Sequence, residues 1–143
     1  MPQERLLVAI SAVSAAEAAI EQTLAYVMDR KAFGQPLSAL QHVRFELTEL
    51  HTETTIGRVF LDHCIALHLE KKLDTATASM AKYWLTELQF RVLDRCVQLH
   101  GGYGYMREYA VARAWADARV QRIYGGTTEI MKEIISRSLF ERR

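Results

Sequence analysis

The sequence predicts an all-α fold, an antiparallel up-and-down four-helix bundle with one extra short helix. Only two prolines interrupt the 143 residues, Pro2 and Pro36, so long stretches are free to be helical. Apolar residues recur at helical spacing over stretches far longer than a strand. The connections between these stretches are short, which favours neighbouring antiparallel helices. We therefore expect one domain spanning residues 1–143.

The first long helix is predicted from Glu4 to Lys31. Its apolar positions step by 4, 3, 7, 4 and 3 residues, at Leu6, Ile10, Val13, Ile20, Leu24 and Val27. This spacing keeps them on one helical face. The stretch Phe33 to Pro36 should end the helix, because a glycine follows the last turn and a proline comes next.

Two further long helices are predicted, from about Ser38 to Lys71 and from about Thr75 to His100. The stretch "HGGYGY" closes the third helix. A shorter helix should run from about Ala110 to Ile123. The last helix begins near Thr127, where a threonine hydroxyl can cap it and Glu129 suits the helix dipole.

Composition excludes several classes of protein. The formal net charge is +1 and there is no basic run, so we expect no nucleic-acid partner. No apolar stretch is expected to approach the roughly 20 residues that span a bilayer. The start of the chain lacks the pattern of a signal peptide. Cys64 and Cys96 lie in helical patterns, and we expect both to be buried in a reducing compartment.

The histidines and acidic residues do not form a metal motif. None of the five histidines follows a glutamate by three residues, the spacing of di-iron bundles. There is no Cys-x-x-Cys pair either. Glu46, Glu49 and Glu53 share a face, which a solvated helix surface would explain. We expect no metal site.

Three motifs in order resemble the C-terminal helical domain of the acyl-CoA dehydrogenases. They are "DRKAFGQPLSALQ" (residues 29–41), "CVQLHGGYGY" (residues 96–105) and "RIYGGTTEIMKEIISR" (residues 122–137). The resemblance covers nearly the whole chain. It implies an FAD-dependent enzyme that oxidises an acyl-CoA thioester to the trans-2-enoyl-CoA. The family's N-terminal helical domain and middle β domain have no counterpart in these residues, so the chain alone should be inactive.

The resemblance also implies a set of FAD contacts. Arg30 is similar to the family's arginine that meets the FAD pyrophosphate across a dimer interface, and a guanidinium fork suits two phosphates. Phe33 resembles the aromatic residue packed near that arginine. The further implied contacts are Gln41, Gln98, Gly101, Gly102, Thr127 and Glu129. Ordinary roles stay open: a dipole-offsetting arginine, a polar helix surface for the glutamines, and capping at the last helix.

The position of the catalytic base follows from the last motif. Many family members carry the catalytic glutamate directly after its tyrosine, but here Gly125 follows Tyr124. A smaller group, resembling the long-chain and isovaleryl enzymes, places the carboxylate at the start of this domain's first helix. Counting back from the first motif, that position is Glu4. We expect Glu4 to be the base, in an apolar pocket that raises its proton affinity. Charge at a helix N-terminus is the alternative.

The remaining expectations concern substrate and partners. Arg5 and Gly126 are expected to bind the acyl-CoA, with a solvated surface charge as the alternative for Arg5. The resemblance implies an electron-transfer partner such as an electron-transferring flavoprotein, and a homodimer or tetramer. The expected location is the cytoplasm, or alternatively the mitochondrial matrix. Two other functions stay open: a non-catalytic oligomerisation module, and a related acyl-CoA oxidase that passes electrons to oxygen.

Overall fold

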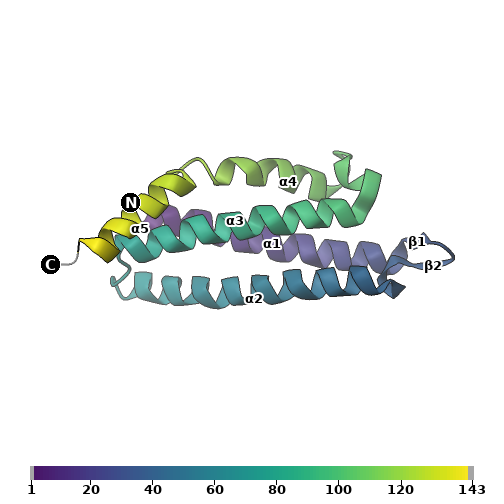
Figure 1. Cartoon of the computed structure of the whole chain (residues 1–143), viewed down its shortest axis with the longest axis horizontal. Helices are drawn as coiled ribbons and strands as arrows, with labels where there is room; N and C mark the ends of the chain where they lie inside the picture. The colour runs from purple at the N-terminus through teal and green to yellow at the C-terminus, as the bar shows by residue number, and fades with distance from the viewer. Residues whose placement is uncertain (1, 142–143) are drawn as a thin grey trace.

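The structure, a computed structural model, describes residues 2–141; Met1, Arg142 and Arg143 lie outside the described part. Five α-helices carry the fold, with a short hairpin and two 3-10 turns at one end (Figure 1). The elements are α1 (Pro2–Asp29), β1 (Lys31–Ala32), β2 (Gln35–Pro36), η1 (Leu37–Ala39), α2 (Gln41–Leu69), α3 (Thr75–His100), η2 (Gly101–Tyr105), α4 (Ala110–Gln121) and α5 (Thr128–Phe140).

The helices form the predicted all-α, up-and-down bundle. Helix α3 packs against all four other helices, and α1 is its most extensive neighbour. Helices α4 and α5 follow one another along α3, on the side away from α2 (Figure 1). The two short helices α4 and α5 therefore occupy together the position of the fourth helix in the bundle.

Small residues bring the long helices close together. The buried face of α1 is rich in alanine, at Ala9, Ala12, Ala16 and Ala19. Gly57 does the same for α2, because a Cβ there would lie 2.8 Å from Leu88 Cδ2 on α3. The predicted burial of Cys64 and Cys96 is confirmed, and burial raises the pKa of the Cys96 thiol to about 11.

The predicted end of the first helix is wrong. Helix α1 ends at Asp29, and Lys31 and Ala32 pair with Pro36 and Gln35 in a two-stranded hairpin. Phe33 and Gly34 form its turn, with φ of 54° and 79°. Two successive positive φ values match the twist of a tight hairpin. Gly34 therefore serves a strand turn, not a helix end.

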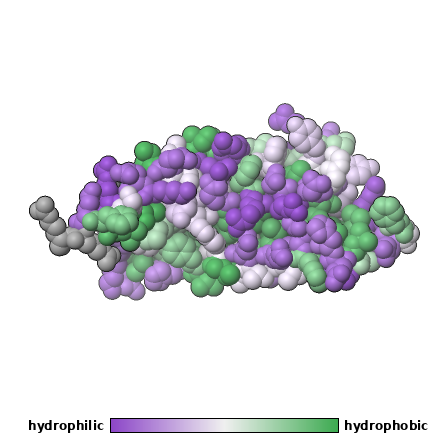
Figure 2. Space-filling view, in the orientation of Figure 1, coloured by the Kyte–Doolittle hydropathy of each residue, from purple (hydrophilic) through white to green (hydrophobic). Residues whose placement is uncertain are grey.

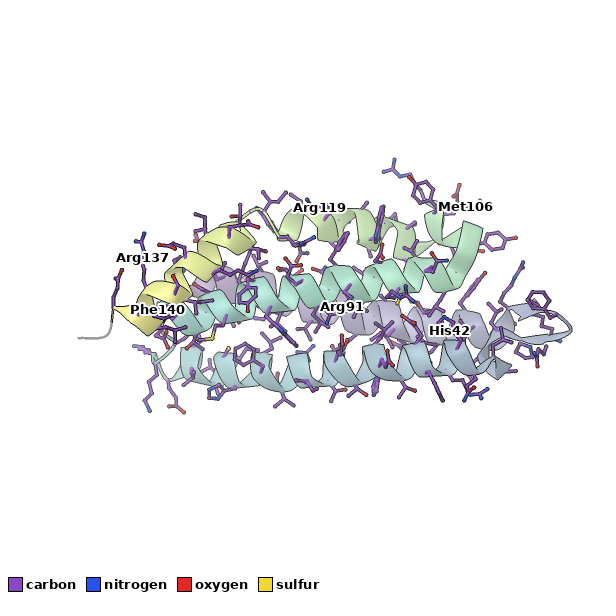
Figure 3. All side chains as sticks on the ribbon, in the orientation of Figure 1. His42, Arg91, Met106, Arg119, Arg137 and Phe140 are labelled. Carbon is purple, nitrogen blue, oxygen red and sulfur yellow. The ribbon has the colours of Figure 1, made fainter. Side chains whose placement is uncertain are left out.

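The acidic face of α2 is also not simply solvated. Arg91 on α3 lies between the two helices and donates to Glu53 Oε2 at 2.6 Å (Figure 3). Arg95 donates one hydrogen bond to each carboxylate oxygen of Glu46, from Nε to Oε1 and from Nη2 to Oε2. These two glutamates tie α2 to α3. The expectation of a solvated face is wrong for Glu46, whose side chain is 14% exposed, whereas Glu53 remains 42% exposed beside Arg91.

One expectation about membranes needs correction as well. Helix α1 is long and apolar enough, by length and composition, to cross a membrane. Within the bundle, 44% of its most apolar window is buried. Core helices of bundles can share this composition, and α1 packs against α2, α3 and α4. Hydrophilic residues are interspersed among hydrophobic ones over the visible face of the molecule (Figure 2).

Candidate functional site

The residues expected to form a site lie in two clusters at opposite ends of the bundle (Figure 1). The loop-end cluster, beside the start of α1 and the α4–α5 loop, contains Glu4, Arg5, Gly126, Thr127 and Glu129. The hairpin-end cluster contains Arg30, Phe33, Gln41, Gln98, Gly101 and Gly102. Along α1 the two clusters are roughly 39 Å apart, at about 1.5 Å per residue. One chain therefore presents two separate surfaces.

At the loop end, the glycine pair before α5 lies against α1. Gly125 and Gly126 have φ of 67° and 104°, which favours glycine at both positions. A Cβ on Gly125 would have one near neighbour, Val8 Cγ2 at 3.9 Å. Val8 follows Glu4 by one helical turn on the same face of α1. The structure thus brings the two alternative positions for the base, Glu4 and Gly125, to the same end of the bundle.

Side chains of helix α3 bind this loop at Gly126 and at the residues that flank it, Arg122 and Thr128. The Lys82 ammonium donates to the Gly126 carbonyl oxygen at 2.6 Å, and its side chain is 0% exposed. Glu87 Oε1 accepts from Arg122 Nε at 2.8 Å and from the Thr128 hydroxyl at 3.0 Å. Burial, with a smaller contribution from the nearby Arg5, lowers the pKa of Lys82. The loop is therefore fixed by polar contacts to two side chains of α3, the buried Lys82 and the partly exposed Glu87.

The first turn of α1 departs from two expectations. Glu4 is exposed, so this chain alone does not supply the apolar pocket expected around the base. Arg5 is only partly exposed and donates from Nη1 to the Ser79 hydroxyl on α3 at 3.1 Å. Its Nε is buried and has no hydrogen-bond partner within residues 2–141. The alternative of a solvated Arg5 is therefore wrong.

Thr127 and Glu129 occupy the first turn of α5. The Thr127 hydroxyl accepts the Ile130 N–H at 3.3 Å, so the expected capping is confirmed. Glu129 is exposed, and hydrogen bonds from its own N–H and from Thr127 lower its pKa. These capping contacts leave the expected cofactor contacts open as predictions.

At the hairpin end, a hollow of about 550 Å³ gathers four of the expected cofactor residues, Arg30, Gln98, Gly101 and Gly102. The Arg30 guanidinium lies 5.2 Å from the Tyr103 ring centre. A Cβ on Gly101 or Gly102 would meet no atom within 4 Å. The backbone at these two glycines is therefore accessible to a molecule that approaches from outside the bundle. Met106, which also lines the hollow, lies at this end of the bundle (Figure 3).

Two expected members of this cluster stand apart from the hollow. Phe33 is 93% exposed on the hairpin turn and does not pack beside Arg30. Tyr103 takes that place. Gln41 opens α2, is exposed and does not line the hollow. Any cofactor contact by Phe33 or Gln41 would therefore lie outside this hollow.

Several residues that build these sites were not found from the sequence. Lys82 and Glu87 on α3 hold the loop, and Arg122 bonds to Glu87. The signal for Lys82 was present, since it lies three residues before Leu85 on the buried stripe of the helix. A charged residue there calls for a buried partner. For Tyr103 the sequence held no comparable signal.

Comparisons with known proteins match these motifs. The family described as "Acyl-CoA dehydrogenase, C-terminal domain" matches residues 1–140. The mitochondrial long-chain specific acyl-CoA dehydrogenase of Rattus norvegicus is 56% identical over 97% of this chain and 32% of its own length. A caffeyl-CoA reductase–Etf complex subunit of Acetobacterium woodii is 33% identical over 96% of this chain and 36% of its own. The chain spans about a third of such relatives.

Solved structures agree with these matches. An acyl-CoA dehydrogenase from Geobacillus kaustophilus has a TM-score of 0.95 and 49% identity, over 97% of this chain and 37% of its own. A glutaryl-CoA dehydrogenase from Mycobacterium smegmatis, in complex with FADH2, has a TM-score of 0.92 and 25% identity, over 96% of this chain and 36% of its own.

Proposed function

The chain belongs to the acyl-CoA dehydrogenase family as its C-terminal helical domain, and from this premise we propose that it completes the active site of an FAD-dependent acyl-CoA dehydrogenase. In this proposal Glu4 removes the α proton of the acyl-CoA, and the β hydrogen leaves as hydride. One observation carries the assignment of the base. Gly125 offers no acid or base, and it lies against Val8, one turn from Glu4.

The first turn of α1 is held where a base is needed. The Arg5 contact to Ser79 ties this turn to α3, and Lys82 ties the facing loop to the same helix. Leu7 is 58% exposed beside Glu4 and offers an apolar surface for a substrate or a neighbouring domain. Covering this surface would desolvate the Glu4 carboxylate and raise its proton affinity.

The residues of the hairpin end fit a phosphate-bearing cofactor. A guanidinium at Arg30, an amide at Gln98 and open backbone at Gly101 and Gly102 are suited to the pyrophosphate of FAD. FAD would supply the hydride acceptor. Because this cluster lies far from Glu4, we propose that it serves the FAD of a neighbouring subunit. Thr127 and Glu129 would then contact the FAD beside Glu4, with Arg5 and Gly126 facing the acyl-CoA.

The proposal includes the partners of the complete subunit. Acyl-CoA is the substrate class, and an electron-transferring flavoprotein is the proposed acceptor, as the complex named for the Acetobacterium woodii relative suggests. We propose a homodimer or tetramer in the cytoplasm or mitochondrial matrix. The likeness to the long-chain enzyme of rat favours long-chain substrates.

The test is Glu4→Gln in the complete subunit, with Glu21→Gln, an exposed glutamate on the same helix, as the matched control. Flavin absorbance is followed after anaerobic addition of a long-chain acyl-CoA. We expect Glu4→Gln to keep its FAD and to slow bleaching by roughly 10²- to 10⁴-fold, the range for a lost general base. The control should bleach at the normal rate.

Other outcomes would point elsewhere. Normal bleaching in Glu4→Gln would remove Glu4 as the base. A wild-type subunit that assembles but never bleaches would indicate an oligomerisation module. Rapid reoxidation of the reduced flavin in air would indicate an oxidase.

A further inference from the structure

We propose that Lys82 is a positioning residue that sets the Gly125–Gly126 loop against the first turn of α1. This inference rests on the proposed function, because it concerns the distance between Glu4 and the loop that faces it. Lys82 is not among the residues proposed above to contact the substrate or the cofactor. It would act through the one backbone carbonyl that it holds.

The geometry shows a direct connection from the helix core to the loop. The Lys82 side chain is 0% exposed, and its ammonium donates to the Gly126 carbonyl oxygen at 2.6 Å. That carbonyl belongs to a glycine with φ of 104°, a conformation that the loop sequence alone holds weakly. A charge-assisted hydrogen bond is a strong way to fix such a residue.

The same face of α3 also holds α1. Ser79 precedes Lys82 by three residues and accepts from Arg5 Nη1 at 3.1 Å. Residues three apart on a helix are neighbours on one face. One turn of α3 therefore contacts both the first turn of α1, which carries Glu4, and the Gly125–Gly126 loop. This makes α3 the common reference for the two halves of the proposed site.

Packing alone does not account for a lysine here. A buried ammonium is costly unless it is paired, and an apolar side chain of similar length would fill the same space at lower cost. Arg5 stands close enough to disfavour the charge on Lys82, while Glu87 and Glu129 favour it. Lys82 therefore has both positive and negative neighbours, and the hydrogen bond from its ammonium goes to the loop.

The test compares Lys82→Met with Gln89→Met. Gln89 is a matched control, since it is 1% exposed on the same helix and its Oε1 has no hydrogen-bond partner within the described chain. Amide hydrogen exchange of the chain is measured by NMR. We expect Lys82→Met to speed exchange at Tyr124 and Thr128 about tenfold relative to the control, with core amides of α3 changing equally in both variants. Unchanged loop amides, or a uniform change over the bundle, would overturn the proposal.

A second readout uses the complete subunit. Lys82→Met should lower kcat/KM for acyl-CoA roughly 10- to 100-fold while the FAD content stays near normal, as expected when a group that faces the substrate is misplaced. If the wild-type subunit fails to bleach, the proposed function fails, and loop exchange still decides the role of Lys82. Altered loop exchange with a normal kcat/KM would overturn the positioning role alone.

A third measurement needs no variant and covers the case in which Lys82→Met does not fold. The wild-type chain, labelled with ¹⁵N and ¹³C, should show a scalar coupling across the hydrogen bond between Lys82 Nζ and the Gly126 carbonyl carbon. A freely exchanging Lys82 ammonium without that coupling would overturn the proposal.

Discussion

A single carboxylate, Glu46, shows how the bundle uses charge between helices. Its side chain is 14% exposed, although it lies on the polar side of α2. Arg95 on α3 binds it through two nitrogens, with Nη2 donating to Oε2 at 2.9 Å. The hydrogen bond from Arg95 is the main reason that the pKa of Glu46 is lowered, and burial opposes it.

This lowered pKa gives a stability prediction with a defined sign. The pair stabilises the fold above the carboxyl's unfolded pKa, and its contribution is lost as pH falls through the lower folded value. Glu46→Gln should therefore reduce the free energy of unfolding by about 0.5 to 1 kcal/mol at neutral pH, and by nearly nothing in acid. Urea unfolding at several pH values measures the difference. Glu49→Gln, an exposed neighbour, is the control, and a difference constant across pH would contradict the argument.

At the scale of elements, Gly125 and Gly126 in the loop before α5 should contribute differently to the stability of the fold. A Cβ on Gly126 would lie 2.4 Å from Met131 Cε, a buried side chain, and φ there is 104°. A Cβ on Gly125 would meet Val8 Cγ2 at 3.9 Å only. The two positions differ in space as well as in backbone conformation.

Gly126→Ala should therefore cost more stability than Gly125→Ala. We expect roughly 1 to 3 kcal/mol for Gly126→Ala from strain and displacement of Met131. For Gly125→Ala we expect about 1 kcal/mol from its left-handed backbone. Denaturant midpoints with unchanged slopes would measure both. The reverse order would show that the loop relaxes away from Met131.

The elements that were predictable are those fixed by a long apolar pattern. The predicted third helix coincides with α3, Thr75–His100, because Asp74 caps its start and Gly101 with φ of 59° ends it. The hairpin after α1 was not predictable. Phe33 adopts φ of 54°, which bulky residues rarely do, and the nearby Gly34 and Pro36 also fit a helix end.

The same division holds for the candidate site. The glycine motif and the count back to Glu4 predicted two positions that the structure places at the same end of the bundle. The contacts that fix the loop, from Lys82 and Glu87, join residues at least 35 positions apart in sequence. Such pairings depend on helix rotation and register, which the apolar pattern defines only coarsely.

At the scale of the whole molecule, the two clusters suggest how subunits share a site. The hairpin-end hollow and Glu4 lie at opposite ends of α1, so a single chain cannot bring Arg30 and Glu4 to one flavin unless the cofactor spans the bundle. In a twofold dimer, the hairpin end of each chain can meet the flavin of the other. Light scattering should therefore show at least a dimer.

Complementation between two inactive subunits tests this arrangement. Glu4→Gln removes the proposed base, and Arg30→Ala removes the proposed contact to the partner's FAD. In a mixed dimer, one site carries both defects and the other carries neither. Random pairing of equal amounts should therefore restore roughly a quarter of wild-type activity, since half the dimers are mixed and half their sites are intact. Coexpression with two tags isolates the mixed dimer, and each single variant is the control. A mixed dimer as inactive as both parents would place Arg30 and Glu4 at the same subunit's flavin.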